Sequence, residues 1–131
     1  MSEENVEIVC RMYTAFHGGD AEGALAHFDP EVVIDASARL DGGVGQGLEE
    51  LNTIIGRWLG AFDGWHEEID EMRDLGSVVY VAATQRGRGK ASGIDVESHY
   101  ALLYEVRGAN ITRMTLYASR SEALEAAGLS E

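Results

Sequence analysis

Hydrophobic residues recur at three- and four-residue steps in three parts of the chain, which is typical of amphipathic helices. The apolar stripes are Val6, Val9, Met12, Tyr13 and Phe16, then Ala24, Leu25 and Phe28, and finally Leu48, Leu51, Ile55, Trp58, Leu59 and Phe62. The pattern predicts helices over residues 3–17, about 21–28 and about 48–62. Gly18-Gly19 ends the first helix, and Asp20 is expected to cap the second.

The pattern changes to alternation with a period of two after Gly64, which predicts β-structure. Strands are expected over residues 31–38, 65–74, 78–86, 95–106 and 111–118, with a hairpin turn over 107–110. Ser119 and Glu122 form a capping box that opens a short last helix ending at Gly128. Strands that follow one another in a run favour antiparallel pairing, so the sequence predicts one α+β domain over residues 1–131.

The chain has 131 residues and a formal net charge of −13, so partners that demand a basic face, nucleic acids and anionic membranes, are not expected. There is no apolar run of about 20 residues and no signal-peptide core. With a single cysteine, Cys10, a reducing, cytoplasmic location fits best. Its place among Val6, Val9 and Tyr13 at helical spacing predicts a buried, inert thiol.

No metal or cofactor is expected, because His17, His27 and His66 show no metal-ligand spacing. The sequence also contains no nucleophile elbow, dinucleotide fingerprint or phosphate loop.

Two stretches carry a family resemblance. The opening stretch is Tyr13-Thr-Ala-Phe16, Gly19-Asp20, Ala24-Leu25 and Phe28-Asp29-Pro30-Glu31-Val32-Val33; the closing stretch is Asn110-Ile111-Thr112-Arg113 and Tyr117-Ala118-Ser119-Arg120-Ser121-Glu122-Ala123-Leu124. Together they resemble the superfamily of nuclear transport factor, ketosteroid isomerase and SnoaL-like polyketide cyclases. This resemblance implies a cystatin-like cone, in which N-terminal helices wrap a curved antiparallel or mixed sheet around a pocket. It also implies a small organic ligand and a homodimer through the outer sheet face.

The catalytic residues of related enzymes carry over only in part. Ketosteroid isomerase-like enzymes use a carboxylate base on the first strand, and Asp35 matches that position to within one residue. Their two oxyanion donors, a Tyr and a protonated Asp, fall on Met12 (next to Tyr13) and near Leu102, so that pair is not expected here. The acidic residue that epoxide-hydrolase-like members and SnoaL-like cyclases have on the last strand falls on Leu116.

Asp35 and His99 are the candidate catalytic residues. Asp35 lies within an apolar strand, where a carboxylate is costly unless it is exposed, paired or used. It is therefore a pocket base with a raised pKa or, alternatively, a solvent-facing group or a partner of Arg39. His99 can titrate near neutral pH, but matching Leu102 to an inward position turns it outward, so its role stays open.

The candidate ligand-pocket residues are aromatic: Tyr13, Trp58, Phe62, Tyr80, Tyr100 and Tyr117. Pockets for organic molecules are mostly apolar with a few polar groups, and tyrosine supplies both, although plain core packing is the alternative. The basic stretch Arg86-Gly87-Arg88-Gly89-Lys90 is either an anion-binding nest or a solvated hairpin tip. Its candidate partners are an anionic tail of a ligand and the acidic strand 65–74 of the same or a neighbouring subunit.

Two functions follow. The chain binds a small organic molecule in the cone and possesses isomerase-, cyclase- or hydrolase-type activity with Asp35 as base, or it is a non-catalytic binding or dimerisation module. Whether it is an enzyme is left open.

Overall fold

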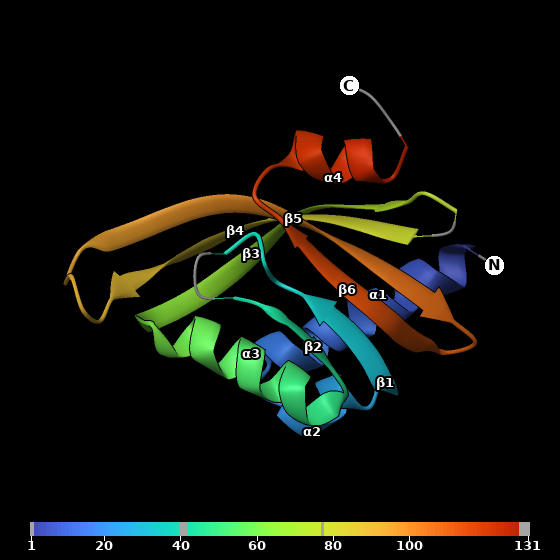
Figure 1. Cartoon of the computed structure of the whole chain (residues 1–131), viewed down its shortest axis with the longest axis horizontal. Coiled ribbons are helices and arrows are strands. Elements are labelled where there is room, and N and C mark those ends of the chain that lie inside the picture. The colour runs from blue at the N-terminus through green and yellow to red at the C-terminus, as the bar shows by residue number, and fades with distance from the viewer. Residues whose placement is uncertain (1, 40–41, 77, 129–131) are drawn as a thin grey trace.

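The computed structural model describes residues 2–39, 42–76 and 78–128, and it arranges them around one curved sheet with helices on both faces (Figure 1). The helices are α1 (Ser2–His17), α2 (Ala21–Leu25), α3 (Leu48–Gly60) and α4 (Arg120–Ala126). The strands are β1 (Phe28–Asp35), β2 (Val44–Gln46), β3 (Phe62–Asp74), β4 (Val78–Gly89), β5 (Asp95–Arg107) and β6 (Asn110–Tyr117). The predicted α+β class is confirmed.

The six strands lie in the order β2-β1-β6-β5-β4-β3. The last four strands of the chain, β3 to β6, pair antiparallel in sequence order, as their consecutive arrangement predicts. The first strand, β1, lies parallel to β6 and antiparallel to the short β2, so the sheet is mixed.

Alternation along the central strands divides the buried residues between the two faces. On β5, Tyr100, Leu102 and Tyr104 belong to the larger core, and the intervening Ala101 and Leu103 belong to a smaller one on the opposite face. Helices α1, α2 and α3 cover the inner, concave face, whereas α4 covers the outer face (Figure 1). A side chain's place in a strand therefore decides whether it reaches the inner space or the outer surface.

The N-caps predicted at Asp20 and Ser119 are confirmed, although the Glu122 side chain accepts from the Ser119 hydroxyl instead of completing the capping box at the Ser119 backbone N–H. The Asp20 side chain accepts a hydrogen bond from the backbone N–H of Gly23, and the Ser119 hydroxyl accepts one from the N–H of Glu122. Gly108 has a φ of 63°, which permits the tight turn between β5 and β6.

Several sequence predictions need correction. Helix α2 ends at Leu25, before the predicted end at residue 28, and Phe28 already opens β1. The short edge strand β2 was not among the expected strands, and β4 runs on to Gly89, past the predicted end at residue 86. Cys10 is exposed, because the apolar face of α1 is centred on Val9 and Met12.

No helix within the described ranges combines the length and the apolar character needed to cross a membrane.

Candidate functional site

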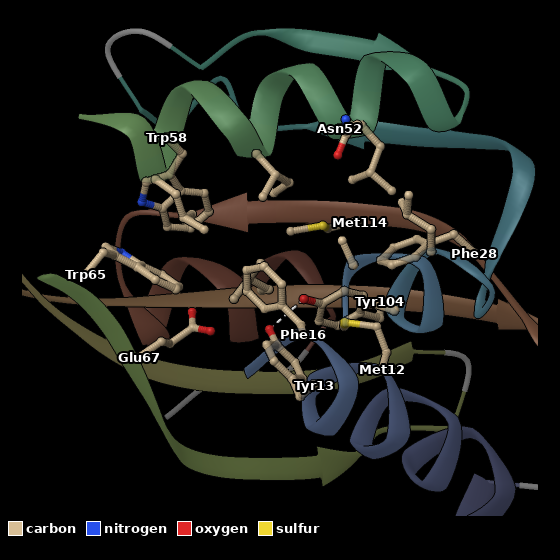
Figure 2. A pocket seen from close by; sticks show the side chains of 17 residues that line it. Met12, Tyr13, Phe16, Phe28, Asn52, Trp58, Trp65, Glu67, Tyr104 and Met114 are labelled. Atoms are coloured by element: carbon tan, nitrogen blue, oxygen red, sulfur yellow. Dashed lines mark hydrogen bonds between the residues drawn. The ribbon is translucent and has the colours of Figure 1, made fainter. Parts of the chain in front are cut away.

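The inner face of the sheet encloses a cavity of about 90 Å³ between α1, α2, α3 and the strands β3, β5 and β6 (Figure 2). Its wall is almost entirely apolar. Six aromatic side chains contribute to it: Tyr13, Phe16, Phe28, Trp58, Trp65 and Tyr104. An enclosed apolar cavity with a few polar groups is the usual form of a site for a small organic molecule.

Glu67 on β3 supplies the charge of this cavity. Its side chain is 4% exposed, because Glu67 shares the inner face of β3 with Trp65 and Ile69. The Oε1 atom lies 2.9 Å from Nε2 of His17, which stands in the last turn of α1. The Oε2 atom accepts a hydrogen bond from the Tyr100 hydroxyl. These two hydrogen bonds offset part of the cost of burying the carboxylate.

Tyr13 and Tyr104 form a second polar group in the cavity wall. Their hydroxyl oxygens are 2.5 Å apart, and their rings meet edge to face with centroids 5.9 Å apart. Burial raises the pKa of Tyr13 well above its ordinary value, and the charges of Tyr104 and Glu67 add to the effect. Burial also raises the pKa of Tyr104 and Tyr100. All three phenols are therefore protonated near neutral pH. Tyr100 donates its proton to Glu67, and one hydroxyl of the Tyr13–Tyr104 pair donates to the other.

A buried glutamine fixes the two indole rings of the wall. Gln85 Oε1 accepts hydrogen bonds from Nε1 of Trp58 at 2.8 Å and from Nε1 of Trp65 at 2.7 Å. Its Nε2 donates to the Ser98 hydroxyl at 2.8 Å. Because Gln85 is only 4% exposed, it holds both rings from within the sheet.

A second cavity of about 180 Å³ also contacts Trp58 and is lined in part by Arg39, Ser98 and Tyr117. The guanidinium carbon of Arg39 lies 4.8 Å from the centroid of the Trp58 ring. Trp58 thus separates an enclosed apolar cavity from a polar one.

The candidate aromatic residues take different places. Tyr13 and Trp58 line the enclosed cavity, and Tyr100 and Tyr117 line the second one. Phe62 packs at the margin of the inner core. Tyr80 lies on the outer face in the cluster that α4 covers, so it does not reach either cavity.

Asp35 points away from the inner space. Its neighbour Ile34 is buried in the inner core, so Asp35 lies on the outer face of β1. It accepts hydrogen bonds from the backbone N–H and the hydroxyl of Ser37, and these lower its pKa, with a smaller contribution from the charge of Arg113. The raised pKa that a pocket base requires is therefore not found, and the hydrogen-bond partner of Asp35 is Ser37.

His99 also lies on the outer face of the sheet with its side chain 60% exposed, and it contributes to the lining of the second cavity. Its Nδ1 is 2.8 Å from the hydroxyl of Thr84, which in turn donates to Asp70. The basic stretch forms ion pairs within the chain: Arg86 with Glu68 and Glu97, and Arg88 with Asp95. Glu68 belongs to the acidic stretch 65–74, one of the partners considered for these cations.

Sequence reasoning missed Glu67, His17 and Tyr104 as site residues, and it did not expect a pair of hydroxyl donors. The signal for Glu67 was available, since alternation puts it on one strand face with Trp65 and Ile69. In the described part of the chain, no three His, Cys, Asp or Glu side chains gather as metal ligands would.

The matches to known proteins agree with this architecture. The sequence model of the SnoaL-like domain family matches residues 9–114. The chain therefore belongs to the SnoaL-like domain family. No curated protein sequence matches.

Similar solved structures share the fold at low sequence identity. An NTF2-like protein of unknown function from Burkholderia pseudomallei superposes with a TM-score of 0.77 at 21% identity, over 93% of this chain and 95% of the other. TerC, co-crystallised with polyporic acid, superposes with a TM-score of 0.74 at 20% identity, over 95% of this chain and 98% of the other. A protein with a ketosteroid isomerase-like fold from Catenulispora acidiphila, in complex with trimethylamine, superposes with a TM-score of 0.72 at 24% identity, over 94% of this chain and 93% of the other.

Proposed function

We propose that this protein binds one small organic molecule in the enclosed cavity, with an apolar body against the aromatic wall and one polar group at Glu67. The observation that carries the proposal is the composition of the wall: Glu67 is the one charged residue among the described residues that line it. A buried carboxylate at the end of an apolar cavity is costly, and a ligand that engages it would recover part of that cost. The small molecules crystallised with TerC and with the Catenulispora protein support a binding role for this fold.

The size of the cavity limits the ligand. An apolar cavity of about 150 Å³ holds benzene, so the 90 Å³ found here suits a compound of about four to six heavy atoms unless the wall rearranges.

Thermal unfolding with a panel of small amines, alcohols, ketones and carboxylic acids tests the proposal. A compound that binds only the folded protein raises Tm, and at one hundred times its Kd it stabilises by about 2.7 kcal/mol.

Ala24→Leu fills the cavity, because Ala24 is buried in its wall. Ala26→Leu, at the exposed end of α2, is the matched control. Compounds should raise Tm of the native chain and of A26L, but not of A24L, whose fold is checked by circular dichroism. The proposal fails if no compound raises Tm, or if the shifts persist in A24L.

Proton transfer is a second candidate function, favoured by the shared position of Glu67 and the Tyr13–Tyr104 pair in one wall. Glu67 would take a proton from the ligand, and the one hydroxyl of the pair that does not donate to the other would donate a hydrogen bond to an oxygen that gains charge. The base role predicted for Asp35 has no such support, because Asp35 lies on the outer face. Once a substrate is found, Glu67→Gln should abolish turnover and Asp35→Asn should leave it unchanged; the reverse result would restore Asp35.

Dimerisation through the outer sheet face remains the non-catalytic alternative. Beside α4 this face presents the exposed side chain of His99, which hydrogen-bonds to the buried Thr84, and Thr84 in turn donates to Asp70. Sedimentation equilibrium of the native chain and of a variant with a charged residue at the exposed position, His99→Glu, decides the point. A dimer that H99E dissociates supports the alternative, whereas a native monomer contradicts it.

A further inference from the structure

We propose that the ligand of the enclosed cavity is a small organic ammonium ion, with Glu67 as its counter-ion and the rings of Trp65, Phe16 and Tyr13 as its cage. This inference rests on the binding function proposed above and specifies its ligand class. Figure 2 shows the Glu67 carboxylate on the same side of the cavity as these three rings, and all four side chains line the wall.

Glu67 is the only charged side chain among the described residues of the wall. Neither Lys nor Arg occurs among the described lining residues, and the other polar ones are Asn52 and the two tyrosines. His17 and Tyr100, the hydrogen-bond partners of Glu67, are not among the residues that line this wall, and His17 is also its ion-pair partner when it is protonated. Each carboxylate oxygen has two acceptor sites, so both oxygens retain capacity for a ligand N–H.

The charge of Glu67 disfavours a second negative charge at this end of the cavity. After burial, which is the largest cause, the charge of Glu67 raises the pKa of Tyr100, and it also contributes for Tyr13 and Tyr104. A negative charge that disfavours ionisation of three phenols also disfavours an anionic ligand and favours a cationic one. Arg39 lowers the pKa of Tyr100, but its effect is smaller than that of Glu67.

The aromatic wall suits a cation as well. The faces of Trp and Tyr attract ammonium groups, and cages of such rings are a known means of binding them. Phe16 and Trp65 stand with ring centroids 5.9 Å apart and a tilt of 55°. The Arg39 guanidinium lies over the Trp58 ring, and Arg39 lines the second cavity. One aromatic ring of the wall therefore already makes a cation–π contact, on the side of that second cavity. The formal net charge of −13 draws cations toward the protein as a whole.

A matched pair of probes tests the charge requirement: neopentylamine and neopentyl alcohol have the same shape, and only the amine is charged. Alkyl amines are protonated at pH 7, as the lysine side chain is with its pKa of about 10.4. Calorimetric titration should show the amine binding at least about 10-fold more tightly than the alcohol, the preference expected of a partly buried charge pair. Glu67→Gln should remove this preference without abolishing binding of the alcohol, and Glu67→Asp should keep part of it.

Glu68→Gln is the control, because Glu68 is the adjacent carboxylate on the outer side of β3 and pairs with Arg86. It should leave the preference for the amine intact. Equal binding of the two probes, or a preference that survives in E67Q, overturns the ammonium inference and leaves the proposed function standing. If the native chain binds neither probe while the wider panel yields ligands of other classes, only this inference fails; if the panel also yields none, both fail. Circular dichroism of E67Q and E67D establishes that each variant is folded.

Discussion

The hydroxyl groups of Tyr13 and Tyr104 meet at 2.5 Å, although 91 residues separate them along the chain. Helix α1 and strand β5 contribute one residue each, and both side chains are at most 6% exposed. This hydrogen bond ties the N-terminal helix to the centre of the sheet directly at the cavity wall. It therefore links the stability of the fold to the shape of the site.

Removal of one hydroxyl should destabilise the protein, because the other hydroxyl loses its hydrogen-bond partner. Tyr13→Phe and Tyr104→Phe are each expected to lower the free energy of unfolding by about 1–3 kcal/mol, since a buried donor or acceptor loses its partner. The double variant should cost clearly less than the sum, because it leaves no orphaned hydroxyl. Urea denaturation of the four proteins measures the coupling. Additive losses would show that the two hydroxyls do not depend on each other.

Gln85 should be among the most sensitive polar positions of the inner face. Gln85→Met preserves the approximate size but leaves the indole N–H groups of Trp58 and Trp65 without their acceptor. We expect a loss of about 2–4 kcal/mol and a change in tryptophan fluorescence, because both rings lose their anchor. Gln46→Met, at an exposed position of β2, is the control and should be nearly neutral. A loss no larger than in Q46M would contradict the anchoring role.

The buried phenols should resist alkaline titration. Burial raises the pKa of Tyr13, Tyr100 and Tyr104 in the folded protein above the ordinary value of about 10. A raised folded-state pKa gives stability that is complete below the unfolded pKa and is lost as pH rises above it. Absorbance at 295 nm should therefore show only part of the tyrosines titrating near pH 10, with the remainder appearing together with loss of circular dichroism. All tyrosines titrating near pH 10 in a folded protein would contradict their burial.

Asp35 should stabilise the folded protein near neutral pH and lose this effect as the pH falls. Hydrogen bonds from Ser37 lower its folded-state pKa. A lowered pKa gives stability that is present above the unfolded value of about 3.9 and is lost as pH falls through the folded value. Asp35→Asn should thus be less stable than the native chain at pH 6, and the difference should vanish in acid. Ser37→Ala should show the same trend in urea denaturation at pH 6 and pH 2.5. A pH-independent difference would mean that the charge of Asp35 does not matter.

The sequence predicted the fold well because its signals are local. Helical stripes, the caps at Asp20 and Ser119, and the consecutive strands each depend on a few neighbouring residues. The site depends on which face of a strand a residue occupies, and a shift of one residue reverses that face. Asp35 lies outward beside the inward Ile34 for this reason.

Glu67 shows the second limit of sequence reasoning. It stands in an acidic stretch, where charge indicates a solvated strand, and β3 carries register irregularities on both sides of it, at Asp63/His66 and Ile69/Glu71. Only the placement of Trp65 and Ile69 on the same face reveals that it points inward. The contact of Tyr13 with Tyr104 joins distant segments, so no local pattern could predict it.

The most direct test of the central claim is a crystal structure of the protein soaked with neopentylamine or with a stronger ligand from the thermal panel. We predict electron density for one molecule inside the cavity bounded by Tyr13, Trp58 and Glu67, with its polar group within hydrogen-bonding distance of the Glu67 carboxylate. Density only in the second cavity beside Arg39 or on the outer face, with the enclosed cavity unoccupied, would contradict the account.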